Sequence, residues 1–364
     1  MQIFTDFFND IHPGYPIETM APLDKILFID IETTGLSREL TDLYLIGCGY
    51  FNKNGYNTIQ WFADSPEDEA EVIQAFYDFV AGRFELLIHY NGNHFDIPYL
   101  KAKALKHDLA LPFKDMDNYD IYLAIKPFKN ALSLPSLRQR CVEELLEINS
   151  DDPYSGRDLI GVYHKYVSEP SDDLLYPLLY HNSEDLKGMA YILPVIYYTH
   201  LKDISLEYVS HGIHKYHDLQ DNEHMELLVT YKHDIKIPKG FNFKDGNIIL
   251  HISPDGRATL RLPLINTTLK RFYPNYKDYY YLPAEDTCIY KSAASSVPRE
   301  RRENAKKETC YTKHSGLFIP ILSGSDLPVF KSDHSSKEIF TPFIEEDHQK
   351  IFTIFGDLLI SHAF

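Results

Sequence analysis

Two acidic residues one position apart, Asp30 and Glu32, stand at the end of an apolar run that begins near residue 25 and turns at Gly35. Side chains alternate between the two faces of a strand, so both carboxylates point the same way. Two carboxylates against an apolar sheet repel one another and lose hydration unless a cation lies between them. Oxygen ligands with no Cys or His nearby favour a hard ion, so the pair predicts a Mg²⁺ or Mn²⁺ site.

The composition predicts a globular protein with a large core. The chain has 364 residues, of which 44% are hydrophobic and 14% aromatic, enough for two domains. No apolar run is long enough to span a bilayer, and no basic-then-apolar leader precedes an export cleavage site. The four cysteines are scattered and form no C-x-x-C pair. We therefore expect reduced thiols, a cytoplasmic location and no membrane partner.

The net charge of −17 argues against a nucleic-acid partner until its distribution is considered. Residues 1–204 carry 16 Lys and Arg against 32 Asp and Glu, a net charge of −16, whereas residues 205–364 carry 20 against 21, a net charge of −1. The acidity therefore lies in the half that holds Asp30 and Glu32. Bound metal ions would cancel only part of this charge, so most of it is expected on solvated surface.

Hydrophobic periodicity predicts an α/β domain at residues 25–200, after an irregular leader at residues 1–24. The expected strands are 25–31, 43–51, 57–63 and 85–90, with a further short strand near 117–120. The expected helices are 66–82, 97–107, 134–147, 157–168 and 172–198, the last with Pro177 as a kink or restart. This order of strands and helices predicts a mixed β-sheet flanked by helices.

Residues 205–364 are predicted to form a β-rich (α+β) accessory domain. Alternating apolar residues at 248–252 and 258–262 indicate strands, and glycines follow Asp or Lys at the expected turns. A final helix is expected near 343–362.

Two further motifs carry residues that suit metal chemistry. Asp96 closes the motif Tyr-Asn-Gly-Asn-His-Phe-Asp at residues 90–96, where an expected strand gives way to a helix and loops gather catalytic groups. The motif His-Asn-Ser-Glu-Asp at residues 181–185 lies in the expected long helix, and His181 and Asp185 share a helix face because they are four apart. Asp120, at the end of the short strand, is a weaker signal.

Together these motifs resemble those of the DEDD exonucleases of the ribonuclease-H-like superfamily, and they are most similar to the YprB-type branch. Members of that branch similarly carry an Asp-x-Glu-Thr-Thr-Gly strand, a Tyr-Asn-Gly-x-x-Phe-Asp turn and a His/Tyr-Asn-x-x-Asp helix. The resemblance covers residues 24–198. It implies a ribonuclease-H-like fold and a two-metal nuclease that removes nucleotides from the 3′ end of DNA or RNA.

The resemblance also implies a role for each site residue. Asp30 would bridge two divalent ions, Mg²⁺ or Mn²⁺, while Glu32 and Asp185 would hold them individually. Asp96 would bind largely through water, and His181 would take the proton from the attacking water, because its pKa lies near neutrality. The residues expected near the terminal nucleotide are Thr33, Thr34, Gly35, Leu36, Asn91 and Phe95.

The position of the base departs from the family pattern. Members with a histidine base place it five residues before the last aspartate, and members with a tyrosine place it four before. His181 therefore has the tyrosine spacing, and Tyr180 has the histidine spacing. His181 is the predicted base and Tyr180 the alternative, although helix histidines often only cap or pack.

Two alternatives remain for the chain as a whole. A single Asp-x-Glu pair is usually a surface or turn feature, and a protein that kept the fold and lost turnover would be a binding or scaffold protein. The presence of all four carboxylates favours the enzyme. The accessory domain can serve as a docking surface for a protein partner, or its basic residues, at 270–271 and in a run at 299–307 that we expect to be helical, can hold nucleic acid. A solvated helix is the equal alternative for that run.

Overall fold

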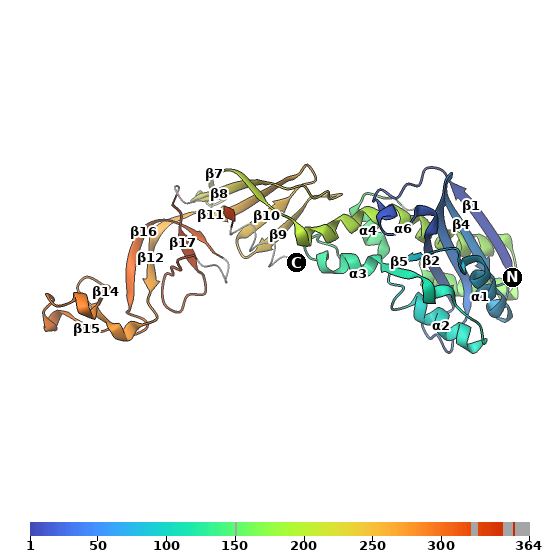
Figure 1. Ribbon diagram of the computed structural model, residues 1–364, viewed down its shortest axis with the longest axis horizontal. Coiled ribbons are helices and arrows are strands. Elements are labelled where there is room, and N and C mark those ends of the chain that lie inside the picture. Colours follow the sequence, from blue (N-terminus) through green and yellow to red (C-terminus); the bar gives the residue numbers. More distant parts are fainter. Residues whose placement is uncertain (150, 322–326, 345–351, 354–364) are drawn as a thin grey trace. The chain divides into compact units, whose positions relative to one another are not determined.

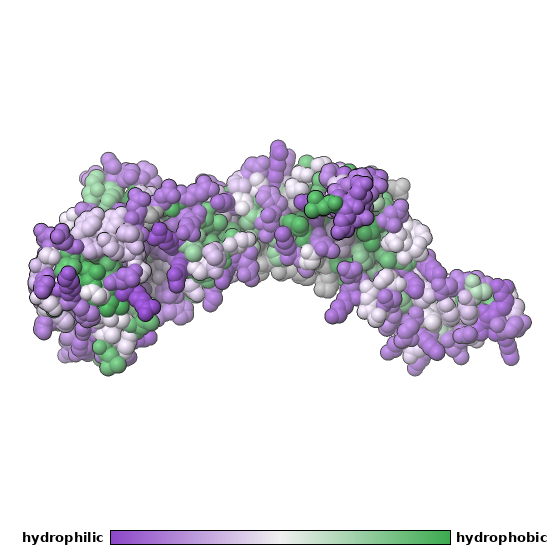
Figure 2. Space-filling model, turned by 180° about the vertical axis from the view of Figure 1, so that it is seen from behind, coloured by the Kyte–Doolittle hydropathy of each residue, from purple (hydrophilic) through white to green (hydrophobic). Residues whose placement is uncertain are grey.

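The computed structural model describes residues 1–149, 151–321, 327–344 and 352–353 (Figure 1). The chain divides into two compact units. The first comprises Met1–His200 with Ile237–Lys239, and the second comprises Leu201–Lys236 with Gly240–Phe364. Hydrophilic residues cover most of the visible surface of both units, with apolar residues in small groups (Figure 2).

A six-stranded mixed sheet forms the centre of the first unit. Its strands are β1 (Gln2–Phe8), β2 (Ile26–Thr33), β3 (Leu43–Asn52), β4 (Gly55–Phe62), β5 (Leu86–His89) and β6 (Asp117–Asp120), in the order β1-β4-β3-β2-β5-β6. β2, β3, β4 and β1 pair antiparallel, whereas β5 and β6 run parallel to β2. β2 is therefore an inner strand, and residues 26–29 of it are at most 1% exposed. An apolar inner strand of this kind gives Asp30 and Glu32 a fixed place.

Six α-helices of the described residues accompany this sheet. They are α1 (Glu69–Val80), α2 (Asp96–Lys106), α3 (Ile121–Ile125), α4 (Gln139–Leu145), α5 (Gly156–Ser168) and α6 (Asp172–Tyr191). α6 packs on β2, β3 and β4 and is itself covered by α4 and α5, while α1 packs on β3 and β4. No helix among the residues described above is long and apolar enough to cross a membrane.

Most of the predicted elements of the first unit are confirmed, with three corrections. The prediction of an irregular leader is wrong, because residues 2–8 form the edge strand β1. The mixed apolar and polar pattern of this strand reflects exposure on both of its faces. The helix expected at 134–147 is only α4. α6 ends at Tyr191 and a 3-10 segment follows, because Pro194 has no N–H to continue an α-helix, whereas Pro177 lies inside α6 without ending it.

A buried ion cluster joins α1 and α2 to the start of β3. Glu69 is fully buried at the start of α1 and accepts hydrogen bonds from Leu43 N–H at 2.8 Å and Lys106 Nζ at 2.8 Å. Lys103 Nζ lies 2.9 Å from the same carboxylate and is itself 1% exposed, and His107 Nε2 lies 2.6 Å away. Four donors therefore surround one carboxylate.

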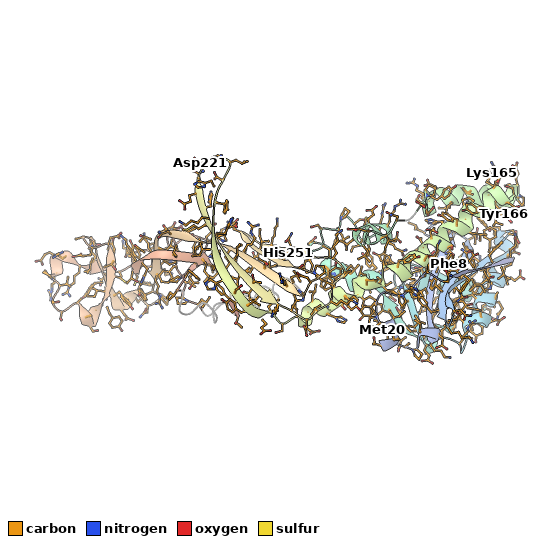
Figure 3. All side chains as sticks on the ribbon, turned by 90° about the horizontal axis from the view of Figure 1, so that it is seen from above. Phe8, Met20, Lys165, Tyr166, Asp221 and His251 are labelled. Atoms are coloured by element: carbon orange, nitrogen blue, oxygen red, sulfur yellow. The ribbon has the colours of Figure 1, made fainter. Side chains whose placement is uncertain are left out.

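The second unit begins with a five-stranded antiparallel sheet in the order β7-β8-β11-β10-β9. Its strands are β7 (Glu207–His217), β8 (Glu223–Lys232), β9 (Phe241–Asp245), β10 (Ile248–Ile252) and β11 (Arg257–Pro263). The strands expected at 248–252 and 258–262 are confirmed as β10 and β11. Asp221 lies in the turn between β7 and β8 (Figure 3), with a positive φ of 64°.

Two three-stranded sheets follow. One contains β12 (Ile265–Phe272), β16 (Tyr311–Pro320) and β17 (Phe340–Pro342), and the other contains β13 (Tyr279–Leu282), β14 (Thr287–Tyr290) and β15 (Glu303–Asn304). The helix expected at the basic run 299–307 is wrong, because residues 299–301 form one 3-10 turn and residues 303–304 pair with β13. The helix expected at 343–362 lies almost wholly outside the described residues.

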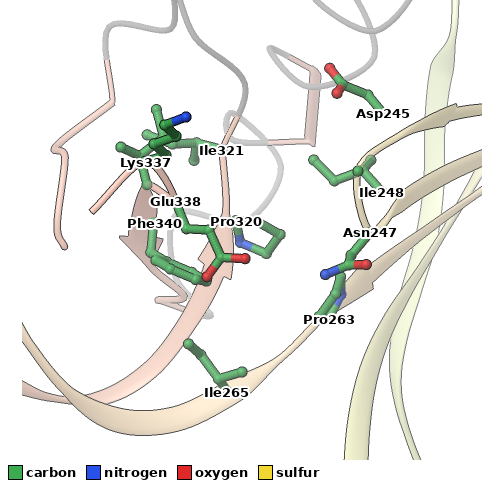
Figure 4. A pocket seen from close by; sticks show the side chains of 12 residues that line it. Asp245, Asn247, Ile248, Pro263, Ile265, Pro320, Ile321, Lys337, Glu338 and Phe340 are labelled. Carbon is green, nitrogen blue, oxygen red and sulfur yellow. The ribbon is translucent and has the colours of Figure 1, made fainter. Parts of the chain in front are cut away.

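A pocket of about 500 Å³ lies in the second unit, between the β9–β10 turn and the strands β16 and β17. Ile248, Ile265 and Phe340 give it an apolar lining, and Asp245 and Lys337 stand at its rim (Figure 4). None of the predicted site residues lines it, so it is separate from the candidate site.

Candidate metal centre

The predicted carboxylates of β2 face α6. Asp30 lies opposite Gly47 of β3, and the β2–β3 register shifts just after Glu32. Asn182 of α6 donates from Nδ2 to Asp30 Oδ2 at 2.7 Å. Glu32 is 7% exposed. The strand and the helix together therefore hold both acids at a buried contact between sheet and helix.

α6 brings two further predicted residues to Glu32. His181 Nε2 lies 3.8 Å from Glu32 Oε1 and 3.9 Å from Asp185 Oδ2. One ligand atom from each of these three residues lies within 4.8 Å of the others. The four-residue spacing on one helix face thus places an imidazole and a carboxylate beside the β2 acid.

Asp96, in the first turn of α2 and 6% exposed, lies near enough to Asp30 for its charge to raise the pKa of that carboxyl. The loop before it is held by Asp120, whose carboxylate accepts from Asn91 N–H at 2.9 Å and from Asn93 N–H at 3.4 Å. Asn91 has a left-handed φ of 62°, a conformation that Asn tolerates better than most residues. Asp120 therefore positions the loop that carries Asp96.

His89 holds the same loop from inside the sheet. Gly92 N–H donates to His89 Nδ1 at 3.0 Å, and His89 Nε2 lies 2.8 Å from Asn118 Oδ1. A Cβ at Gly92 would lie 2.7 Å from the His89 ring, so the glycine permits this close approach. His89 is thus a structural residue, as expected for a buried histidine with two partners.

The four carboxyl groups have raised pKa values, and burial is the largest cause for each. The pKa is raised to about 8 for Glu32, about 7 for Asp96 and about 6 for Asp185, and well above its usual value for Asp30. Repulsion from neighbouring carboxylates adds to burial in every case. Burial lowers the pKa of His181, but the charges of Glu32 and Asp185 outweigh it and leave this pKa raised. Several crowded carboxylates of this kind fit a divalent cation, which would relieve their repulsion.

Sequence reasoning missed the residues that hold Asp30. Asn182 donates to Asp30 and accepts at Oδ1 from Gln60 Nε2 of β4 at 2.8 Å. A Cβ at Gly47 would lie 1.9 Å from Asn182 Oδ1, so only glycine leaves room for the amide. Asn182 stood inside the motif at 181–185, whereas Gln60 and Gly47 gave no sequence signal.

Gly47→Ala is expected to destabilise the first unit by about 1–3 kcal/mol, because overpacking forces the buried Asn182 amide away from Asp30. Gly161→Ala on α5 is the matched control, since no atom lies within 4 Å of its Cβ position. Thermal unfolding measures both variants. An equal unfolding temperature for Gly47→Ala and wild type would contradict the proposed crowding.

A second missed residue contacts the predicted base. Asp152, in the segment before α5, is 5% exposed, and its Oδ2 lies 2.5 Å from His181 Nδ1. Its Oδ1 accepts from Tyr154 N–H at 3.0 Å. A hydrogen bond donated by Nδ1–H to this carboxylate fixes the His181 ring with Nε2 facing Glu32 and Asp185. Nothing in the spacing of residue 152 from the three motifs could have indicated this contact.

The alternative base, Tyr180, directly precedes His181 on α6 but has different neighbours. The Tyr180 ring stacks on Tyr176 at 5.4 Å, and Lys187 Nζ lies 6.0 Å from the ring centroid. Tyr180 also lines a groove with Phe8 and Glu184. The structure thus brings His181, rather than Tyr180, into contact with Glu32 and Asp185.

The residues expected near a terminal nucleotide mostly serve the loop after β2. Thr33 Oγ1 donates to Gly35 O at 2.8 Å, and Thr34 Oγ1 accepts from Asp42 N–H at 2.8 Å. Leu36 is 86% exposed and has no such internal role. The Phe95 ring, before Asp96, packs 5.5 Å from that of Tyr99.

Comparisons with known proteins find one family model and several solved structures. Residues 27–197, a little under half of the chain, match the family model described as the RNase_H superfamily. A search of curated proteins finds no match. Structural similarity is found to the family B DNA polymerase of the archaeon Pyrobaculum calidifontis, with 13% identity, a TM-score of 0.38, and coverage of 71% of this chain and 36% of the polymerase.

Escherichia coli exonuclease I is also similar. Its zinc-bound complex with single-stranded DNA shares 14% identity with a TM-score of 0.30, and the match covers 57% of this chain and 54% of the exonuclease. Its complex with a dT13 oligonucleotide shares 12% identity with the same TM-score and coverage. This chain thus spans about a third of the polymerase and about half of the exonuclease. By the family match and its mixed sheet with flanking helices, residues 27–197 form an RNase H-like domain.

Proposed function

We propose that the first unit is a metal-dependent nuclease that hydrolyses phosphodiester bonds of DNA or RNA, as a 3′–5′ exonuclease of the YprB type. The observation that carries this proposal is the meeting of the buried Glu32 with the half-buried His181 and Asp185 beside Asp30, with Asp96 contributing charge to the same site. Such a cluster has little structural value without a cation, because its carboxylates repel one another.

Asp30, Glu32 and Asp185 are the residues that would hold the divalent ions directly, and Asp96 would act through water. Bound Mg²⁺ or Mn²⁺ would activate a water and neutralise the charge that develops on the phosphate and the leaving oxygen. Asn182 keeps the Asp30 carboxylate oriented toward this site. We propose that Leu36, whose side chain is open to solvent, contacts a terminal base.

His181 is the proposed general base. Its Nδ1 is held by Asp152, so Nε2 is the atom that would accept the proton of the attacking water. Tyr180 stays the alternative, and the two are separated by kinetics: His181→Ala should lose most of the turnover, whereas Tyr180→Phe should keep it.

Asp152→Asn is expected to lower kcat by about 10- to 100-fold, because the amide no longer fixes the His181 tautomer and ring. KM should change little, since Asp152 contacts Nδ1 of His181, the ring nitrogen opposite the one that would take the proton. Steady-state hydrolysis of a labelled strand measures both constants. Asp151→Asn, at the exposed neighbouring residue, is the control, and an equal loss in both variants would contradict the positioning role.

The proposed activity is tested with end-labelled single-stranded and duplex DNA and RNA in Mg²⁺, Mn²⁺ or EDTA. Stepwise shortening from the 3′ end that stops in EDTA supports the exonuclease. Cleavage at internal positions would instead indicate an endonuclease. Tight binding without cleavage in either metal would favour the catalytically silent alternative, which the retained carboxylates argue against.

We further propose residues 205–364 as an accessory domain to this nuclease. Their sheets share no strand with the six-stranded sheet among the residues described. The near-neutral charge of this half contrasts with the net −16 of residues 1–204. An accessory role in binding substrate or a protein partner is consistent with that contrast.

A further inference from the structure

Three lysines lie side by side on one face of the β12-β16-β17 sheet. Lys270 of β12 stands opposite Lys313 of β16, and Lys331 pairs with Lys270 on its other side. Lys270 N–H donates to Lys331 O at 2.8 Å, and Lys331 N–H donates to Lys270 O at 2.9 Å. Paired residues of antiparallel strands project to the same face, so the three side chains form one row, here called the lysine face.

The lysine face keeps a surplus of positive charge. Like charges directly opposite each other across strands are destabilising. Lys313 forms an ion pair with Asp286, and Lys270 Nζ lies 4.3 Å from the centroid of the Tyr311 ring. No carboxylate of the described residues forms an ion pair with Lys270 or Lys331. The ammonium groups of the row therefore repel one another, and a bound polyanion would relieve this repulsion.

Groups that suit a nucleic acid border this row. Thr268 and Phe272 share a face with Lys270 because they are two residues away on the same strand. The Thr268 hydroxyl lies 2.7 Å from that of Ser315. The half-buried Phe272 ring lies 5.4 Å from that of His334. The ammonium groups and hydroxyls suit contacts with phosphates, and the aromatic ring suits stacking on a base.

The charge distribution of the chain points to the same region. Residues 265–344 carry 12 Lys and Arg against 9 Asp and Glu, a net charge of +3, in a chain whose net charge is −17. A strand approaching residues 1–204 meets a net charge of −16, so long-range attraction to phosphate must come from elsewhere.

We propose that the lysine face binds the phosphate backbone of a nucleic-acid strand. The identity of this ligand as the substrate of the first unit rests on the proposed nuclease function, whereas binding itself does not. Charge complementarity indicates this ligand. A nucleic-acid strand offers regularly spaced anions to the lysines and bases that can stack on the aromatic ring.

The test uses the full chain and a fluorescein-labelled oligothymidylate in EDTA, with anisotropy as the readout. Lys270→Gln/Lys331→Gln should raise Kd about 25-fold at about 0.1 M salt and make the slope of log K against log salt shallower by about 1.4, since each phosphate contact on a single strand contributes about 0.7. Lys232→Gln/Lys244→Gln, at exposed residues of β8 and β9, is the control with the same charge change and should bind as wild type. Circular dichroism melting checks that both variants fold.

Three results would overturn the proposal: unchanged affinity in the lysine-face variant, an equal loss in the control, or binding to phosphatidylglycerol vesicles but not to the oligonucleotide. The thymidine 5′-monophosphate p-nitrophenyl ester separates this proposal from the nuclease function, because it has one phosphate and no strand. Its metal-dependent hydrolysis should be equal in wild type and the lysine-face variant. If wild type hydrolyses neither ester nor strand, the nuclease function fails and the anisotropy still decides the lysine face.

Discussion

Asp30→Asn is expected to lower metal-dependent hydrolysis by about 10³-fold or more, because ion stabilisation of transition-state charge supplies several kcal/mol and each 1.36 kcal/mol is tenfold. Asp30 is the carboxyl group whose pKa burial and its neighbours Asp185 and Glu32 raise well above the usual value. An amide of the same shape cannot replace an ionised oxygen shared by two cations. Initial rates on an end-labelled strand at saturating Mg²⁺ measure the loss.

The same variant should not unfold at a lower temperature than wild type in EDTA. Neutralising Asp30 removes like-charge repulsion inside the buried site, which is unfavourable when no cation is bound. Asp78→Asn, at an exposed residue of α1, is the control for both measurements. Full activity in Asp30→Asn would contradict the metal role, and a collapse of its unfolding temperature would show that the loss of activity reports misfolding.

Glu69→Gln is expected to destabilise the first unit by about 3–5 kcal/mol, because it leaves Lys103 buried without its carboxylate. Burial alone would raise the pKa of Glu69, but the hydrogen bond from Leu43 N–H and those from Lys106, His107 and Lys103 lower it to about 2. Urea unfolding gives the free energy directly. Glu71→Gln, two residues along α1 at a side chain 62% exposed, should change stability by less than about 0.5 kcal/mol.

The pH dependence of stability follows from the direction of this shift. The folded pKa of Glu69 is below the unfolded value, so its contribution is present above about pH 4.5 and is lost as pH falls toward about 2. Wild type should therefore lose its advantage over Glu69→Gln across that interval. A constant difference between the two proteins from pH 7 to pH 3 would contradict the ionised cluster.

Local patterns predicted the fold of the first unit because they coincide with its burial. The apolar run ending in Asp30 became an inner strand, and the His181 and Asp185 spacing became one face of α6. β1 was not predicted, because an edge strand exposed on both faces has no alternation of apolar and polar residues. The strand within the basic run at 299–307 was not predicted, because its pairing with β13 is a tertiary contact that local β-propensity does not reveal.

In the candidate site, too, the sequence predicts some residues and not others. The acids and the histidine stood out because their side-chain chemistry and spacing are visible in the sequence. The residues that orient them did not, since Asp152 reaches His181 across 29 positions and Gln60 reaches Asn182 across 122. A Gly47 that makes room for an amide on another element likewise gives no local signal. Positioning contacts of this kind depend on packing between distant segments.

The most direct test of the metal centre is anomalous diffraction from crystals soaked in Mn²⁺. The proposed site predicts two peaks about 3.5–4 Å apart, both adjoining Asp30, with Glu32 and Asp185 each on one of them. A map with no peak among Asp30, Glu32 and Asp185 at a Mn²⁺ concentration that supports hydrolysis would contradict the two-metal centre.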